Sequence, residues 1–138
     1  MTEVERLAML RRHLDHLQAL RPRVSGPDVL EEDLSLHNDV LFSLLTVAQL
    51  VIDIAGSLTA SEGHPFEDYT EAVRNLKRLE GFPGEMVDRL ARLPGFRNIL
   101  VHDYVELDFD LVIQALHELE PVEDFVRRVA TRLEGRGA

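Results

Sequence analysis

The chain has no cysteine and no tryptophan among its 138 residues. Without cysteine it has no disulfide framework, no thiol nucleophile and no thiolate metal ligand, a composition that fits the reducing cytoplasm. Basic residues are also scarce, because 15 Lys and Arg stand against 25 Asp and Glu, which gives a net charge of −10. Affinity for phosphate backbones comes mainly from basic side chains. This charge balance therefore argues against nonspecific nucleic-acid binding, and no DNA partner is expected.

The chain also lacks an uninterrupted apolar run long enough to span a membrane. The most apolar stretch, residues 40–52, is interrupted only by Ser43, Thr46 and Gln49 and is shorter than the ~20 residues of a span. Residues 1–20 alternate charged and apolar side chains and lack the uncharged core of a signal peptide. We therefore expect a cytoplasmic protein without a membrane partner. Its length and its apolar content of 45% predict one domain over residues 1–138.

Apolar residues repeat with a helical period along most of the chain, and no β alternation of useful length occurs. The pattern predicts helices over residues 3–20, 34–58, 66–79, 84–104 and 110–133. The second should be the most buried helix, and the third should turn Tyr69 inward. We expect a kink or break at Pro94-Gly95 in the fourth helix and a kink at Pro121 in the fifth. The predicted fold class is an all-α bundle of four to five helices.

One short stretch carries a cation, an amide, an imidazole and a phenol: Arg97, Asn98, His102 and Tyr104. At about 100° per residue, an unbroken helix places these four side chains on one arc, together with Val101 and Val105. The opposite arc carries Phe96 and Leu100, which can anchor the helix in a core. The polar arc is therefore free for another use.

Those residue types suit the cleavage of a phosphodiester. RNA cleavage requires a base for the 2′-hydroxyl proton, a cation for the charged phosphorane and an acid for the leaving oxygen. His102 could serve as base or acid, because imidazole exchanges protons near neutral pH. Arg97 can grip a phosphate with two parallel hydrogen bonds. Asn98, one turn before His102, could orient the imidazole or donate to a phosphate oxygen.

One chain supplies only one imidazole to this reaction. A symmetric homodimer with two such arcs face to face would supply one imidazole for each proton transfer and two arginines for one phosphate. Val101 and Val105 agree with that geometry, because valines between catalytic residues suit an interface better than water.

Acidic and imidazole side chains elsewhere give weaker signals. Asp39 and Asp53 flank the apolar helix, where they could support Arg97 or His102 or pair with an arginine for structure alone. His13 and His16 have a spacing that could place two imidazoles on one metal ion, but no third ligand is near in the sequence. We expect them to face solvent, and we predict neither a metal site nor a cofactor.

The run GFRNILVHDYVELD, residues 95–108, resembles the signature of HepT-like proteins of the HEPN superfamily. That signature is an arginine, four to six residues, a histidine and, in this branch, a tyrosine two residues further. Arg97, His102 and Tyr104 match it without a gap. The similarity extends to VIDIA, DYTEAVRNL and the last predicted helix, so that it covers roughly residues 28–134.

The resemblance implies an all-α, homodimeric ribonuclease toxin that works without metal and cleaves RNA with Arg97 and His102. It also implies a partner, a minimal nucleotidyltransferase antitoxin, which uses ATP to place AMP on Tyr104. The adduct would add negative charge and bulk beside Arg97, in the pocket that receives the RNA phosphate. Modification would thus neutralise the site by occupying it.

Two other functions stay open on the sequence alone. The first is a non-catalytic helical docking or substrate-binding subunit for a nucleotidyltransferase, which the acidity of the chain favours. The second is a metal-dependent hydrolase. The sequence does not distinguish tRNA from mRNA as the substrate.

Overall fold

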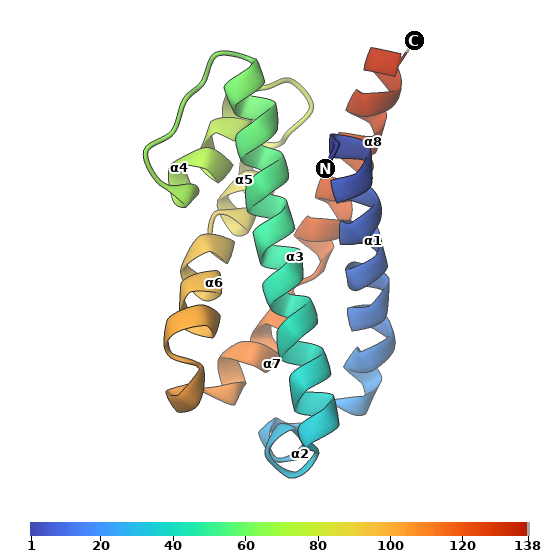
Figure 1. Cartoon of the computed structure of the whole chain (residues 1–138), viewed down its shortest axis with the longest axis vertical. Coiled ribbons are helices and arrows are strands. Elements are labelled where there is room, and N and C mark those ends of the chain that lie inside the picture. The colour runs from blue at the N-terminus through green and yellow to red at the C-terminus, as the bar shows by residue number, and fades with distance from the viewer. Residues whose placement is uncertain (138) are drawn as a thin grey trace.

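The computed structural model describes residues 1–137, which form helices and no β-strand. The central helix is α3 (Leu34–Ser61), as Figure 1 shows. Its neighbours are α1 (Glu3–Leu20), α2 (Pro27–Glu32), α4 (Tyr69–Arg74), α6 (Leu93–His102) and α7 (Phe109–His117). The remaining helices are α5 (Gly84–Leu90) and α8 (Glu120–Gly137), and α8 packs on both α1 and α5. Three single 3-10 turns connect these helices: η1 (Arg21–Arg23), η2 (Asn75–Arg78) and η3 (Tyr104–Glu106).

The core surrounds α3, as the sequence predicts. By length and composition alone α3 could cross a membrane, but neighbouring helices bury much of its surface. Leu10, Leu14 and Leu17 form a fully buried stripe on α1, and Phe125 of α8 is also fully buried. Spacings of three and four residues place such side chains on one face of a helix. Burial of this face stabilises the bundle through the hydrophobic effect.

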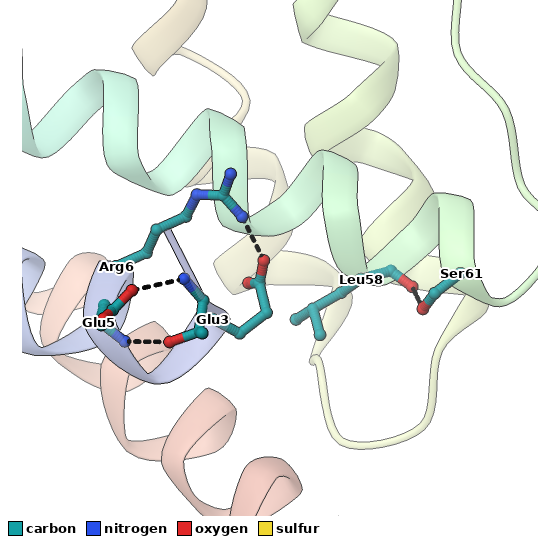
Figure 2. A network of polar contacts seen from close by, with 6 residues as sticks. Glu3, Glu5, Arg6, Leu58 and Ser61 are labelled. Atoms are coloured by element: carbon teal, nitrogen blue, oxygen red, sulfur yellow. Dashed lines mark hydrogen bonds and ion pairs between the residues drawn. The ribbon is translucent and has the colours of Figure 1, made fainter.

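Local hydrogen bonds determine where α1 begins. The Glu5 N–H donates to the Thr2 hydroxyl at 3.1 Å, and the Thr2 N–H donates to the Glu5 carboxylate at 2.7 Å. This capping box satisfies backbone N–H groups that have no partner within the helix. The hydrogen bond from the Thr2 backbone lowers the pKa of the Glu5 carboxyl. Figure 2 shows this turn and the Arg6–Glu3 ion pair beside the end of α3 at Ser61.

The predicted all-α class is confirmed, but residues 1–137 form eight α-helices rather than four to five. Two of the longer predicted helices are divided, and neither division is at the predicted proline. The first falls at Ala91 and Arg92, before Pro94, and the second at Glu118 and Leu119, before Pro121. Both prolines lie in the first turn of the following helix, where the missing N–H leaves no hydrogen bond unmade.

Acidic caps determine where α3 and α4 begin. Asp33 accepts a hydrogen bond from the Leu36 N–H at 3.0 Å, so that α3 begins there and α2 stays a separate short helix. Asp68 accepts a hydrogen bond from the Glu71 N–H at 2.8 Å and begins α4 at Tyr69, later than predicted. The expectation that Tyr69 faces inward is wrong, because its side chain is 43% exposed. Tyr69 is the first residue of a short helix, so the direction of its side chain depends on where the Asp68 cap begins the helix and not on the apolar period.

Candidate active site around Arg97

Helix α6 carries three of the predicted site residues on its outer side. Leu100 is buried against the core and Phe96 is half-buried, which fixes the orientation of the helix on α3. Asn98 and His102 are exposed and Arg97 is half-buried. The structure therefore places the cation, the amide and the imidazole where an external substrate can reach them.

The guanidinium of Arg97 lies at the junction of α3, α4 and α6. Its Nε donates to Oε1 of Gln49 on α3 at 2.9 Å, and its Nη1 donates to Oδ1 of Asn98 at 3.0 Å. Its Cζ lies 5.7 Å from the ring centroid of Tyr69, the first residue of α4. A guanidinium has five N–H groups, so three of them, all on the terminal nitrogens, are not used by these two bonds.

Asp53 contacts this site through a second residue. Its Oδ1 accepts a hydrogen bond from Nε2 of Gln49 at 2.9 Å, one helical turn earlier on α3. Gln49 thus bonds Arg97 with its oxygen and Asp53 with its nitrogen. Of the two roles that the sequence leaves open for Asp53, support of Arg97 agrees with this geometry in an indirect form.

Asp39 is elsewhere, and the expectation that it supports Arg97 does not hold. Its hydrogen-bond partner in the structure is His16 rather than His102. Its Oδ1 lies 2.9 Å from Nε2 of His16 on α1. Ten residues separate Asp39 from Gln49, a distance of about 15 Å along a helix. Asp39 therefore links α1 to α3 at a point remote from Arg97.

Tyr104 does not lie on α6. The helix ends at His102, Asp103 follows with φ −125° and ψ 23°, and Tyr104 begins the 3-10 turn η3. The position predicted for Tyr104 on a continuous helical arc is therefore wrong. Its side chain is 60% exposed, and the neighbouring Val105 is 83% exposed. The phenol is an accessible group two residues beyond the imidazole.

The histidines of α1 are not both solvent-facing as expected. His13 is half-buried, and its Nδ1 lies 3.0 Å from the Ser43 hydroxyl on α3. Burial lowers the pKa of His13, and the charges of Arg12 and His16 act in the same direction. Within residues 1–137, no group of three or more His, Cys, Asp or Glu side chains lies close enough to hold a metal ion.

An apolar cavity of about 420 Å³ lies on another side of α6. Its lining includes Phe96, Ile99 and Leu111 and the ion pair of Arg92 with Glu118. None of the described residues that line this cavity is a predicted site residue. The candidate active site is therefore the exposed surface around Arg97 and not this cavity.

Sequence reasoning missed two residues of the site, Gln49 and Tyr69. Gln49 had a signal, because it is one of three polar residues that interrupt the apolar stretch 40–52 and it precedes Asp53 by one turn. Tyr69 had none, since its position beside Arg97 depends on where α4 begins and on how α4 packs against α6.

The family model described as "Ribonuclease HepT-like" matches residues 10–129 of this chain. The chain belongs to this family. The family predicted from the motif is thereby confirmed, and with it the ribonuclease class.

Two curated relatives have names of the same kind. The mRNA nuclease HepT of Shewanella oneidensis is 26% identical over 126 residues, which cover 89% of this chain and 92% of that protein. A putative RNase of Archaeoglobus fulgidus is 33% identical over 96 residues, which cover 69% of this chain and 73% of the relative.

Solved structures confirm the HEPN-type bundle. The tri-AMPylated HEPN toxin of Shewanella oneidensis, in complex with its MNT antitoxin, superposes with a TM-score of 0.80 at 24% identity. That match covers 95% of this chain and 99% of the toxin. A toxin–antitoxin structure with AMP-PNP also has a TM-score of 0.80, at 23% identity, and covers 94% of this chain and 97% of the matched chain. Bundles of the same shape thus occur in toxin–antitoxin structures, one with an AMPylated toxin and one with AMP-PNP.

Proposed function

We propose that this chain is the ribonuclease toxin of a toxin–antitoxin pair and that it cleaves RNA with Arg97 and His102, without a metal ion. The observation that carries the proposal is the junction around Arg97. Its guanidinium is held by uncharged partners, with terminal N–H groups unused by them, on the same exposed helix as His102. Membership of the ribonuclease HepT-like family supports the proposal.

In the proposed reaction, His102 takes the proton from a 2′-hydroxyl, and the resulting oxygen attacks the adjacent phosphorus. Arg97 stabilises the additional negative charge of the phosphorane. A second imidazole protonates the 5′-oxygen as its bond to phosphorus breaks, which leaves a cyclic phosphate and a 5′-hydroxyl. Asn98 accepts a hydrogen bond from Arg97 through Oδ1, so its amide N–H groups can donate to a phosphate oxygen.

We propose that the second imidazole is His102 of a second copy in a homodimer. Val101 and Val105 flank His102 and are 39% and 83% exposed. Exposed valines on both sides of a polar reactive residue suit contact with a second copy better than contact with water. In such a dimer the two motifs lie face to face across one RNA strand.

We further propose that a minimal nucleotidyltransferase antitoxin controls the enzyme through Tyr104. The tyrosine oxygen attacks the α-phosphorus of ATP, pyrophosphate leaves, and the phenol proton passes to solvent. The resulting phosphodiester carries a negative charge, and Tyr104 begins the turn that follows His102. The likeness to an AMPylated toxin bound to its antitoxin supports this step. We expect the pair to act in the cytoplasm, where RNA and ATP are present.

The cleavage proposal is tested by toxicity in growing cells and by cleavage of purified RNA. Arg97→Ala and His102→Ala should each abolish toxicity and lower the cleavage rate at least a hundredfold, as expected for loss of charge stabilisation or of proton transfer. EDTA should leave cleavage by the unmodified protein unchanged. Full toxicity of either variant would contradict the assignment, and inhibition by EDTA would indicate a metal-dependent hydrolase.

The regulation proposal is tested by intact mass. Co-expression with the transferase should add one or more AMP units to the chain, and fragmentation should locate them on Tyr104. Tyr104→Phe should gain no mass and should stay toxic in the presence of the transferase. Modification at another residue, or an AMP adduct that leaves RNA cleavage intact, would contradict the proposal.

A second candidate function is a non-catalytic docking subunit for the transferase. The net charge of −10 favours it, because such a chain has little general attraction for RNA. A stable complex with the transferase, together with no RNA cleavage by the free chain and no modification of Tyr104, would support this function instead.

A further inference from the structure

Gln49 is placed to determine how Arg97 points. It is half-buried on α3, and both ends of its amide are engaged, with Arg97 on the oxygen and Asp53 on the nitrogen. Reversal of the amide would set an NH₂ group against a guanidinium and an oxygen against a carboxylate. The two bonds therefore select a single orientation of Gln49, and that orientation presents an acceptor to Nε of Arg97.

The chemistry of this contact matters for phosphate binding. A carboxylate at position 49 would also accept from Nε of Arg97, but it could not donate to Asp53, would neutralise much of the charge of Arg97 and would compete with an incoming phosphate. A neutral amide holds the side chain without this loss. The contacts run from Arg97 to Gln49 and from Gln49 to Asp53. Asp53 is the negatively charged member of these three residues; it bonds Gln49 rather than Arg97 and is exposed to water.

A cation that is already in position when the substrate arrives raises the rate of the chemical step. Arginine side chains have many rotamers, and a free one must be ordered during the reaction. A guanidinium already in place stabilises the phosphorane without that reorganisation. Loss of the contact should therefore lower the rate of the chemical step more than it weakens RNA binding.

We propose that Gln49, held in orientation by Asp53, is a positioning residue for Arg97 in RNA cleavage. The proposal rests on the ribonuclease function proposed above. The amide at position 49 keeps Arg97 in place and preserves its full charge for the phosphate. Asp53 acts through Gln49 and does not contact the substrate.

The central test compares Gln49→Leu with Gln49→Glu. Gln49→Leu keeps the size of the side chain but releases Arg97, so kcat should fall about tenfold with a smaller change in KM. Gln49→Glu keeps an acceptor for the Nε–H of Arg97 but adds a negative charge, so RNA binding should weaken and KM should rise.

Gln18→Leu is the matched control. Gln18 is also half-buried and also donates its amide to a carboxylate, that of Glu123 at 3.0 Å, but it links α1 to α8. The proposal requires that Gln18→Leu keep the kcat and KM of the unmodified chain. Equal kcat values for Gln18→Leu and Gln49→Leu would overturn it.

Salt dependence separates charge from position. In a His102→Ala background, which should bind RNA without cleaving it, the affinity for a single-stranded RNA oligomer is measured against NaCl concentration. Each phosphate contact contributes about 0.7 to the slope of log K against log salt for single strands. Gln49→Glu should lower the slope by about one contact, whereas Gln49→Leu should leave it unchanged. A lower slope with Gln49→Leu would contradict a purely positional role.

Variants of Asp53 test the second bond. Asp53→Asn keeps an acceptor for Nε2 of Gln49 and should retain cleavage near that of the unmodified chain. Asp53→Leu removes the acceptor and should lower kcat toward the Gln49→Leu value. Asp53 is exposed, so neither change disturbs the core. Equal kcat values for the two variants would overturn the role of Asp53.

A measurement without activity distinguishes failure of this inference from failure of the function. The Nε–H resonance of Arg97, assigned by its loss in Arg97→Lys, should be sharp in the unmodified chain and broadened by exchange with water in Gln49→Leu. A broadened resonance with unchanged cleavage would overturn the positioning role while the ribonuclease function stands. A chain that shows the sharp resonance but cleaves no RNA would instead refute the function.

Discussion

At the scale of single residues, the partners of Arg97 are two amides and an aromatic ring. Gln49 and Asn98 accept hydrogen bonds from the guanidinium, and the Tyr69 ring lies beside it. The cations Arg132 and Arg136 differ, since both pair with the carboxylate of Glu62, at 2.7 and 2.6 Å. Arg97 therefore keeps its charge for a ligand, although the chain as a whole is acidic.

The Tyr69 ring should contribute to cleavage through its face and not its hydroxyl. Tyr69→Phe keeps the ring beside Arg97 and should leave kcat/KM nearly unchanged. Tyr69→Leu removes a cation–π contact worth roughly 0.5–1 kcal/mol at an exposed site, so kcat/KM should fall about two- to fivefold. Initial rates on a fluorescent single-stranded RNA measure both. An equal loss in the two variants would show that the hydroxyl matters instead.

His13 should make the stability of the fold sensitive to acid. Burial lowers the pKa of His13 below its usual value of 6.5. The unfolded chain therefore binds this proton more readily, and stability present above that value is lost as the pH falls toward the folded pKa. His13→Gln should flatten the fall in unfolding free energy between about pH 7 and pH 5, as measured with urea. If the slope of unfolding free energy against pH were the same in His13→Gln, His13 would not be the source of the acid sensitivity.

At the scale of elements, α4 links a helix cap to the site. It has six residues, it begins at Tyr69, and Asp68 caps it through the Glu71 N–H. A helix this short has little stability of its own. The cap and the packing on α3 and α6 therefore determine where the Tyr69 ring lies.

Removal of this cap should affect both stability and cleavage. Asp68→Ala should lower the free energy of unfolding by about 1 kcal/mol and should lower kcat/KM toward the Tyr69→Leu value. Asp68→Asn retains a cap acceptor and serves as the control. Urea unfolding and RNA cleavage rates measure the two effects. Lower stability with unchanged cleavage would show that α4 does not need its cap to position Tyr69.

The sequence predicts the helical stretches better than their ends. Apolar periodicity identifies α1 and α3 because each buries one continuous stripe or surface. It does not identify the break at Ala91 and Arg92, since residues on both sides keep the same period and no proline stands at the break. The motif residues of α6 are predictable because they are neighbours in sequence. Gln49 and Tyr69 reach Arg97 only through tertiary packing, which a local pattern does not contain.

At the scale of the whole molecule, several basic side chains form ion pairs with acidic ones. Lys77 and Arg74 both approach Asp88, at 2.6 and 3.7 Å, and the hydrogen bond from Lys77 lowers the pKa of the Asp88 carboxyl. Asp88 thus partly neutralises the positive charge of Arg74 and Lys77. RNA attraction in this bundle should come from the motif of each copy, and two copies would double it.

The proposed homodimer should depend on Val105. Val105→Glu places a charge in the expected contact, so the chain should become a folded monomer that no longer cleaves RNA. Val4→Glu is the matched control, since Val4 is 65% exposed on α1. Light scattering after gel filtration gives the mass, and circular dichroism reports the fold. A dimer that survives Val105→Glu, with cleavage intact, would place the interface elsewhere.

The end of α6 at His102 has a consequence for how Tyr104, the proposed modification site, is reached. Tyr104 belongs to a three-residue turn, whereas Arg97 and His102 belong to a helix packed on α3. Local opening of a surface turn costs far less free energy than opening of a packed helix. This difference would let the proposed antitoxin draw the Tyr104 phenol into its own active site while Arg97 and His102 stay in place. Amide hydrogen exchange should be fast at residues 104–106 and slow at Leu100, two separate units of motion that are joined by the single residue Asp103.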